Sequence, residues 1–410
     1  MDRNGCCRAV EGRMPLAQET YCAPSAAVTQ PRRLRVALVA GLVGERGAEK
    51  QLVYMARALD DVGVDVRIYS LKKEVGFYGP LLGSRGLEPV WVGKSRHPFM
   101  RLVALSAELR RYAPDIVQAT HFYTNLYATI AGRLAGSITI GCSRNDVFSE
   151  VRDCGGWGRW LLRMPSFLLV NSHAAKRNAE SLNLNPDDIH VIANVIDLQD
   201  FDSRHAGPAP SLAAPGQSVA IAVGRLFAQK RFDRFLVALA RARNAAPNLK
   251  GVIVGDGPEG PELQRQAQAL NLGPESLTFL GRRTDVPALL RHADMLVLTS
   301  DHEGFPNVVL EAMGARLPVI TTPAGEADLV VRHGETGYVV PFDATEEMAA
   351  RMARLANSPD LRRQLGAAGR HRVELHYSYD NLAGRLLSIY RHIAVHRHRH
   401  DLLRLLEDEK

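Results

Sequence analysis

Residues 300–313 read SDHEGFPNVVLEAM and bring together two carboxylates, a glycine turn and the start of a helix. The apolar run Met295–Leu298 that precedes them is typical of a buried parallel strand. Pro306 suits the first position of a helix, where its missing N–H is not needed, and the residues after Asn307 recur at helical spacing. The pattern predicts a strand, a turn and a helix, the repeating unit of α/β proteins.

The predicted helix start would aim free backbone amides outward near Asn307, and such an end attracts phosphate or sugar oxygens. Glu303 lies in the turn and Glu311 more than one helical turn further on, so the two carboxylates serve different groups. A carboxylate accepts hydrogen bonds from two neighbouring hydroxyls, which suits a ribose or hexose diol. These features favour a nucleotide-sugar site, although the pair alone fits a surface Glu and a helix-face Glu equally well.

The length of 410 residues exceeds what one hydrophobic core usually organises, so we expect two domains of similar size. The net charge of +7 permits contact with anionic lipid and is equally natural for an enzyme that handles diphosphates. Nucleic-acid binding is disfavoured because the basic residues are dispersed and lack interleaved aromatics.

The five cysteines show no metal-binding spacing and no even disulfide framework, which favours a reducing compartment. No stretch is long and apolar enough to span a bilayer, and residues 1–31 lack the apolar core of a secretory signal. Their scattered Arg, Pro and Gly predict a disordered tail. We therefore expect a cytoplasmic protein.

The first half begins with a strand at 36–40, a glycine loop from Gly41 to Gly47, a helix, and a second strand at 64–69. The right-handed crossover of such a unit places the loop at the carboxyl edge of a parallel sheet, where ligands bind. The glycines lack the Gly-x-Gly-x-x-Gly spacing, and the second strand ends in Tyr69-Ser70 where an NAD site needs Asp or Glu. A dehydrogenase is therefore disfavoured.

Polar residues follow three further strands, at 116–119, 138–140 and 167–170; they are His121, Arg144-Asn145 and Asn171–His173. We expect them to form one wall of a cleft along the sheet edge. For His121 the alternative is a histidine that only hydrogen-bonds at a strand end. The Pro-, Ala- and Gly-rich residues 203–217 predict a loop or linker, and we place the domain boundary near Asp197.

The second half repeats this architecture, with apolar runs at 219–223, 251–254, 277–280, 295–298 and 318–322. Arg225 follows the first run and Lys230 precedes a helix, so both cations belong to the same sheet edge as Glu303 and Glu311. Each could stabilise negative charge that develops on a leaving phosphate without a metal. Taken separately, they are ordinary surface cations.

An ordered series of motifs over about residues 33 to 391 resembles the retaining glycosyltransferases of family 4. In the second half these motifs are Gly224-Arg225-Leu226 with Lys230, Gly255–Pro258, Phe279–Gly281, the Glu303-x7-Glu311 frame and Pro323–Gly325. In the first half they are Gly47–Glu49, Pro114–Val117 with His121, and Asn171-Ser172 through Lys176. The resemblance implies the α/β GT-B fold, in which two Rossmann-like domains face one another across a cleft.

Five segments are expected on this basis. They are a disordered N-terminal tail at 1–32, an N-terminal Rossmann-like acceptor-side domain at 33–197, a C-terminal Rossmann-like nucleotide-sugar-binding domain at 198–375, a crossover helix at 376–395 that returns to the first domain, and a charged tail at 396–410. The run His396–His400 would suit a metal or anionic headgroups, but a solvated tail leading into a charged helix is the plainer interpretation.

The residue roles come from the resemblance alone. It implies that Arg225 and Lys230 bind the donor diphosphate, that Glu303 binds the transferred sugar and that His121 lies near it; these four are the implied catalytic set. The implied donor-binding set is Gly47, Gly255, Asp256, Gly257, Arg282, Gly304, Phe305, Pro306, Asn307 and Glu311. In that set Glu311 would hold the ribose hydroxyls. No metal, no settled nucleophile and no cofactor besides the nucleotide diphosphate sugar are implied.

One departure from the family pattern lies at the domain junction, where residues 194–197 read NVID and the family usually has glycine second. Valine cannot adopt the positive φ that glycine allows, which puts a donor contact or hinge at Val195 in doubt.

We therefore expect a retaining, metal-independent hexosyltransferase that uses a nucleotide diphosphate sugar, with UDP slightly favoured over GDP, and a lipid-linked glycan acceptor in polysaccharide biosynthesis. Peripheral contact with the inner face of the cytoplasmic membrane is suggested by Arg159–Arg163, which mixes aromatic, aliphatic and basic groups, although a packed helix explains that segment better. Two alternatives remain: a same-fold epimerase or phosphorylase, and a non-catalytic sugar-nucleotide-binding module. The intact set of Arg225, Lys230, Glu303 and Glu311 disfavours both.

Overall fold

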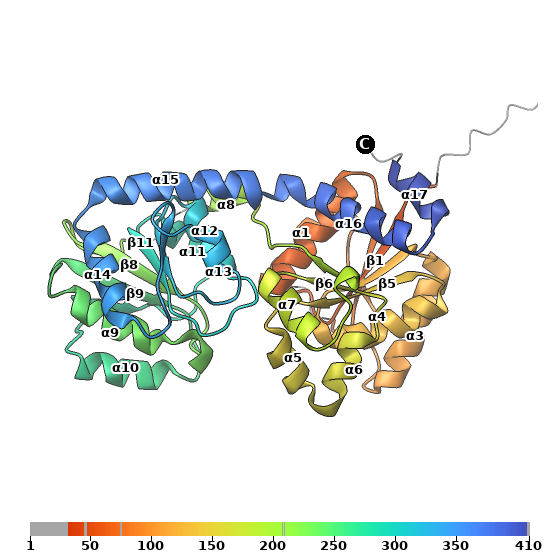
Figure 1. Cartoon of the computed structure of the whole chain (residues 1–410), viewed down its shortest axis with the longest axis horizontal. Coiled ribbons are helices and arrows are strands. Elements are labelled where there is room, and N and C mark those ends of the chain that lie inside the picture. Colours follow the sequence, from red (N-terminus) through yellow and green to blue (C-terminus); the bar gives the residue numbers. More distant parts are fainter. Residues whose placement is uncertain (1–31, 45–46, 74–75, 207, 209, 408–410) are drawn as a thin grey trace, which may run out of the picture. The chain divides into compact units, whose positions relative to one another are not determined.

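The computed structural model describes residues 32–44, 47–73, 76–206, 208 and 210–407. Residues 1–31 of the expected N-terminal tail, with Cys6, Cys7 and Cys22, and the last three residues of the chain lie outside these ranges. The described residues from Arg33 onward build two α/β lobes, each around one parallel sheet (Figure 1).

The first lobe contains a seven-stranded sheet. In spatial order its strands are β3 (Val90–Trp91), β2 (Asp65–Ser70), β1 (Arg35–Ala40), β4 (Ile116–Ala119), β5 (Ile138–Ser143), β6 (Phe167–Val170) and β7 (Ile189–Val191). Its helices are α1 (Gly47–Asp61), α2 (Gly79–Gly83), α3 (Pro98–Tyr112), α4 (Asn125–Leu134), α5 (Val147–Asp153), α6 (Gly158–Arg163) and α7 (His173–Ser181).

The second lobe contains a six-stranded sheet. In spatial order its strands are β10 (Leu277–Phe279), β9 (Leu249–Val254), β8 (Ser218–Val223), β11 (Met295–Leu298), β12 (Val319–Thr321) and β13 (Gly337–Val339). Its helices are α8 (Leu198–His205), α9 (Phe232–Ala242), α10 (Gly260–Ala269), α11 (Val286–Leu290), α12 (Asn307–Gly314), α13 (Ala327–Val330), α14 (Thr345–Ala356) and α15 (Pro359–His376).

Both sheets pair in parallel, and the strand order of each reverses once, between β1 and β4 in the first lobe and between β8 and β11 in the second. The carboxyl ends of the strands at such a reversal border the crevice where open α/β sheets bind ligands. The predicted parallel α/β architecture is confirmed. Gly47 follows β1, His121 follows β4, Arg225 follows β8 and Glu303 follows β11, so the candidate residues come from these two crevices.

Burial on both faces explains why the strands form a core. Every residue of β4, β5, β6 and β11 is buried, as the apolar runs predicted for strands covered by helices on both sides. α9 packs on its sheet through one apolar face, in which Phe235 and Leu239 are fully buried. α12 begins at Asn307, and Pro306 is the residue directly before it. Pro306 was expected at the first position of this helix, so that prediction is wrong by one residue.

The C-terminal segment returns to the first lobe, and Figure 1 shows α16 (Leu382–His396) and α17 (His400–Glu407) beside its elements. Leu386 and Tyr390 are buried in the same core as β1 and α1, and the Tyr390 hydroxyl donates to Gln118 Oε1 at 2.8 Å. Where a charged tail was expected at 396–410, residues 400–407 form a helix that buries Leu402 and Leu406 in this core. Leucines four residues apart on one helix face explain the docking.

Candidate functional site

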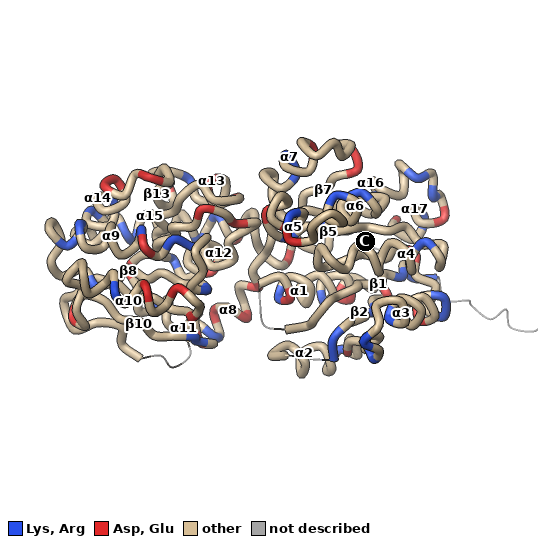
Figure 2. Tube along the Cα trace, turned by 90° about the horizontal axis from the view of Figure 1, so that it is seen from below, with Lys and Arg blue, Asp and Glu red and all other residues tan. Residues whose placement is uncertain are grey.

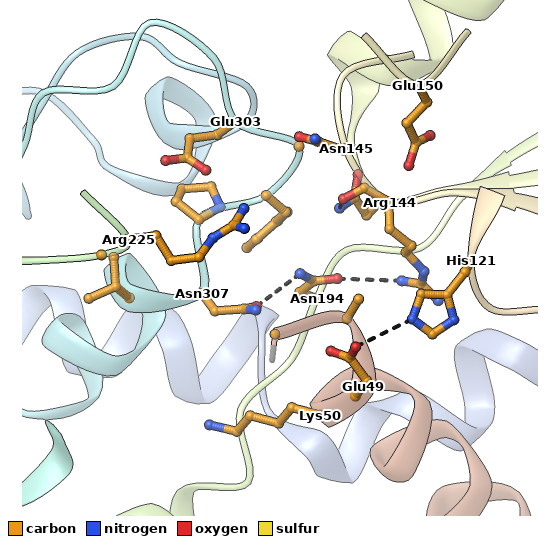
Figure 3. Close-up of a pocket in the computed structure, with 18 of the residues that line it drawn as sticks. Glu49, Lys50, His121, Arg144, Asn145, Glu150, Asn194, Arg225, Glu303 and Asn307 are labelled. Carbon is orange, nitrogen blue, oxygen red and sulfur yellow. Dashed lines mark hydrogen bonds and ion pairs between the residues drawn. The ribbon is translucent and has the colours of Figure 1, made fainter. Parts of the chain in front are cut away.

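Two adjoining hollows lie at the carboxyl edges of the sheets. The first, here called the main pocket, is lined by residues of both lobes (Figure 3). The second, the side pocket, lies mainly against the second lobe. They meet at a neck whose shared lining residues are Gly47, Lys50, Val223, Gly224, Arg225 and Glu311.

Most of the residues predicted from the sequence line these hollows. The main pocket receives Arg225, Lys230, Glu303, His121, Gly47, Gly304, Phe305, Pro306, Asn307 and Glu311. Gly255, Asp256 and Arg282 line the side pocket instead. Gly257 lines neither; a Cβ at this position would lie 2.4 Å from the Leu226 carbonyl oxygen, which gives this glycine a packing role.

The turn after β8 holds the two predicted phosphate-binding cations. Lys230 ends the 3-10 turn η4 (Ala228–Lys230), and its Nζ lies 2.5 Å from Glu303 Oε1. Ser300 Oγ donates to the same carboxylate oxygen at 2.6 Å. The Arg225 guanidinium stacks 4.8 Å from the centroid of the Phe227 ring. The second lobe thus holds the Lys230–Glu303 pair in place with its own residues.

Glycine is required beside this turn. A Cβ on Gly255 would lie 1.8 Å from the Gly224 carbonyl oxygen, and its φ of 145° is one that side chains avoid. The backbone after β9 can therefore pass directly against the backbone after β8, which places Asp256 beside the side pocket.

Lys50 and Glu311 form an ion pair between the lobes at the neck. Lys50 comes from α1 and Glu311 from α12, and Nζ lies 2.9 Å from Oε1. Both side chains are largely buried, at 12% and 18% exposure. Burial disfavours the Lys50 ammonium, but the Glu311 carboxylate together with Tyr54 and Tyr78 outweighs that effect and raises the pKa of Lys50 above its ordinary value.

His121 is held in one tautomer. The Gly41 backbone N–H donates to Nδ1 at 3.3 Å, so Nδ1 acts as the acceptor and the proton is assigned to Nε2. Nε2 lies 3.6 Å from Glu49 Oε1. His121 lines the main pocket, but its Nε2 atom is itself buried and lies on the side of Glu49.

Two glycines allow the lobes to approach closely. A Cβ on Gly304 would lie 2.5 Å from the Arg144 carbonyl oxygen, and one on Gly47 would lie 2.2 Å from Asn307 Nδ2. Asn307 Oδ1 in turn accepts from Asn194 Nδ2 at 2.9 Å, and Arg144 donates to Asn194 Oδ1 at 3.4 Å (Figure 3). Gly47 at the start of α1 and Asn307 at the start of α12 therefore lie in close contact.

The first-lobe wall of the main pocket also contains Glu150, from α5. Burial raises the pKa of this carboxyl to about 7, and the hydrogen bond that Ser143 Oγ donates to it offsets only part of that effect. A carboxyl of this kind changes charge near neutral pH.

Several pocket residues were missed from the sequence. Lys50 and Glu150 carried no motif, and Asn194 belonged to the junction motif at 194–197 without a role of its own, because their roles depend on elements far apart in the chain. Arg144 and Asn145, which follow β5 directly, were expected in a cleft wall and do line the main pocket, although the sequence assigned them no individual role. Val195, the departure from the family pattern, is buried and exchanges two hydrogen bonds with the Gln51 side chain, so it ties the junction to α1.

Neither a metal cluster nor a membrane-spanning helix is found in the described part of the chain. No three His, Cys, Asp or Glu side chains there are placed to share a metal ion. None of its helices combines the length and the apolar character needed to cross a bilayer. Trp157 and Trp160, before and within the suggested membrane patch Arg159–Arg163, are exposed and in edge contact, whereas Leu161 and Leu162, which follow them, pack inward.

Comparison with known proteins agrees with this geometry. The family description "Glycosyltransferase Family 4" matches residues 46–200, and "Glycosyl transferases group 1" matches residues 206–372. The chain is 26% identical to the alpha-D-kanosaminyltransferase of Streptomyces kanamyceticus, over 75% of this chain and 82% of that protein. It is 25% identical to the lipopolysaccharide core biosynthesis glycosyltransferase LpsD of Rhizobium meliloti, over 84% of this chain and 95% of that protein.

Among solved structures, Anabaena HepE in complex with UDP and glucose superposes with a TM-score of 0.74 at 19% identity, over 87% of this chain and 99% of HepE. That likeness concerns the fold, which is GT-B. Each lobe is matched by one family description, the relatives are matched over most of their length, and the fold is shared. The chain therefore belongs to the family 4 glycosyltransferases.

Proposed function

We propose that this glycosyltransferase is a retaining, metal-independent hexosyltransferase whose donor is a nucleotide diphosphate sugar, in the first place a UDP-sugar. The observation that carries the proposal is the arrangement of Arg225, Lys230, Glu303 and Glu311 around one pocket and its neck. Cations suit a diphosphate, and carboxylates beside them suit the hydroxyls of the two attached sugars.

The two hollows divide the donor into parts. The diphosphate would lie at the neck beside Arg225, where the N-terminus of α12 adds backbone amides. The nucleoside would enter the side pocket, near Asp256 and Arg282, with its ribose on Glu311. The hexose would lie in the main pocket between Glu303 and His121.

The reaction then takes place on one face of the hexose. The acceptor hydroxyl oxygen bonds to the anomeric carbon as that carbon's bond to the diphosphate oxygen breaks. The hydroxyl proton passes to the departing diphosphate, and the new bond keeps the configuration of the old one. Arg225 and Lys230 would stabilise the charge that develops on the diphosphate, which is the main contribution of the protein to such a step.

The donor class has support from the neighbours. HepE was solved with UDP, with UDP and glucose, and with UDP-glucose. LpsD acts in lipopolysaccharide core biosynthesis, which supports a glycan acceptor for this chain.

The test begins with thermal-shift measurements against UDP, GDP and ADP and their sugars, followed by detection of released nucleoside diphosphate. We expect stabilisation by UDP and release only when an acceptor is added. Release that depends on inorganic phosphate would identify a phosphorylase, and isomerised donor without acceptor would identify an epimerase. Donor binding without turnover on any glycan would favour the binding module.

A lipid-linked acceptor, used at the cytoplasmic face of the membrane, is supported by what we call the α3 surface. It consists of the exposed Phe99, Met100 and Val103 together with the exposed cations Lys72, Lys73, Lys94 and Arg96. Figure 2 shows blue segments gathered around β2 and α3. Apolar side chains ringed by cations suit an anionic bilayer surface.

Sedimentation with vesicles tests this part of the proposal. We expect binding to vesicles that contain phosphatidylglycerol and little binding to pure phosphatidylcholine. A Phe99→Ser/Met100→Ser variant should lose that binding, whereas Leu134→Ser, an equally exposed leucine on α4, should keep it. Equal binding by all three proteins would contradict the membrane contact.

A further inference from the structure

Lys50 is a buried cation at the neck of the site that the proposed function leaves without a role. It is the fourth residue of α1, as Figure 3 shows by its place near the start of that helix. It lines both hollows together with Arg225 and Glu311. Its ammonium contacts Glu311 Oε1 at 2.9 Å and lies 5.7 Å from the centroid of the Tyr54 ring. Among the described residues, Lys50 is therefore the one lysine of the first lobe that lines the neck between the two hollows.

The helix that carries Lys50 points its N-terminus at the same place. α1 begins at Gly47, and a Cβ on that residue would lie 2.2 Å from Asn307 Nδ2, where α12 begins. Two helix starts therefore converge beside Lys50 and Arg225. Such ends attract anions, and the lysine provides the second, independent feature of an anion site on the first-lobe side.

Charge balance at the neck argues for a further cation. Lys230 is paired with Glu303 and Lys50 with Glu311, so Arg225 is the one cation of these three that is not paired with a carboxylate of the set. A sugar diphosphate diester carries about two negative charges and the released nucleoside diphosphate about three, so the demand for cations grows as the sugar departs.

Glu311 cannot pair with Lys50 and bind both ribose hydroxyls at the same time. Its Oε1 is occupied by Lys50, whereas a ribose diol uses both oxygens of a carboxylate. A flexible four-carbon stem allows the Lys50 ammonium to move by a few ångströms when the ribose hydroxyls arrive.

On the basis of the proposed function, we propose that Lys50 is a third diphosphate-binding cation, supplied by the first lobe and held at the neck by Glu311 until the donor ribose takes that carboxylate. Donor binding then joins the lobes through the diphosphate. The role is specific to the phosphates, which separates it from a structural ion pair.

The test compares Lys50→Met, Lys50→Arg and wild type for UDP, by calorimetry, and for uridine, by ligand-observed NMR at millimolar concentration. We expect Lys50→Met to weaken UDP binding about 10- to 50-fold and uridine binding less than about 3-fold, the range of one charge-assisted contact. Lys50→Arg should restore most of the UDP affinity. Arg265→Met, which removes an exposed positive charge from α10, should leave both affinities unchanged.

Because Lys50→Met leaves Glu311 buried without its cation, a Lys50→Met/Glu311→Gln variant removes both charges and keeps the comparison possible if the single variant fails to fold. It should lose more UDP affinity than Glu311→Gln alone. Equal losses for UDP and uridine in Lys50→Met, or equal UDP affinities in the double variant and Glu311→Gln, would overturn the role of Lys50. Failure of the wild type to bind UDP would instead overturn the donor class and this role together.

Discussion

The first strand–helix turns of the two lobes occupy equivalent places in their sheets but reach their geometry differently. In the second lobe, the Lys230–Glu303 pair is fixed by Ser300 of the same lobe. In the first lobe, Lys50 contacts a carboxylate 261 residues further along the chain. The second-lobe turn is therefore self-contained, whereas the first-lobe turn acquires its partner only when the lobes meet.

The largest expected effect tests the self-contained turn. Arg225→Ala and Lys230→Ala should each lower kcat by about 100- to 1,000-fold, because each removes a cation from the departing diphosphate. Initial-rate measurements with saturating donor check this. Arg265→Ala, which removes an exposed cation on α10, is the matched control and should keep wild-type rates. Unchanged rates for Arg225→Ala or Lys230→Ala would contradict their assignment.

The next effect tests the contact between the lobes. Gly304→Ala adds a Cβ 2.5 Å from the Arg144 carbonyl oxygen, so the first-lobe backbone must move away. We expect kcat/KM to fall by about 30-fold, since displacements near 1 Å cost rates of this order, while UDP affinity falls less. Gly273→Ala, where a Cβ meets open space, is the control. A variant with normal kcat/KM would show that this approach is unnecessary for turnover.

A smaller effect is expected for the carboxylate that connects the turns. Glu311→Gln should weaken UDP binding by about 10-fold, because the amide replaces one of the two acceptors available to the ribose. Calorimetry measures the dissociation constant, and thermal melting measures folding. A dissociation constant equal to that of the wild type would count against the ribose role, whatever the melting temperature.

The smallest effect on activity is expected at Glu150 of the first lobe, because its main consequence is for folding stability. Glu303 and Glu311 of the second lobe are each paired with a lysine, whereas Glu150 is not among these pairs. Its folded-state pKa of about 7 lies above the ordinary value of 4.5, so the folded chain keeps a proton that the unfolded chain releases between these pH values. Wild-type stability should therefore fall as pH rises from about 4.5 to 7 relative to Glu150→Gln, by roughly 3 kcal/mol. Denaturant unfolding at pH 5 and pH 8 checks this; a constant difference would refute it.

Much of the fold was predictable because it depends on local pattern. The apolar runs of β8, β9 and β11 and the turns after them have a two-sided burial signature that any parallel sheet requires. The order of strands and turns then placed Arg225 and Glu303 at one edge. The docking of α17 was not predictable with the same ease, since two leucines within a charged segment leave a solvated helix equally plausible.

The candidate site was predictable only in the parts that carry a motif. Motif residues such as Gly255 and Glu311 line the hollows. Gly257 lines neither hollow and instead packs against the backbone of Leu226. Lys50 and Asn194 could not be placed from spacing, because nothing in α1 or in the junction indicates which residue of α12 they meet.

The sequence by itself determined two parallel α/β sheets, the strand ends at which polar residues gather and the family of transferases to which the chain belongs, since these follow from periodicity and short-range turn chemistry. Only the tertiary structure decided that Lys50 faces Glu311, that Gly304 lies against the Arg144 backbone and that His121 carries its proton on Nε2. The physical reason is that ion pairs, close backbone contacts and tautomers depend on distances of a few ångströms between atoms far apart in the chain.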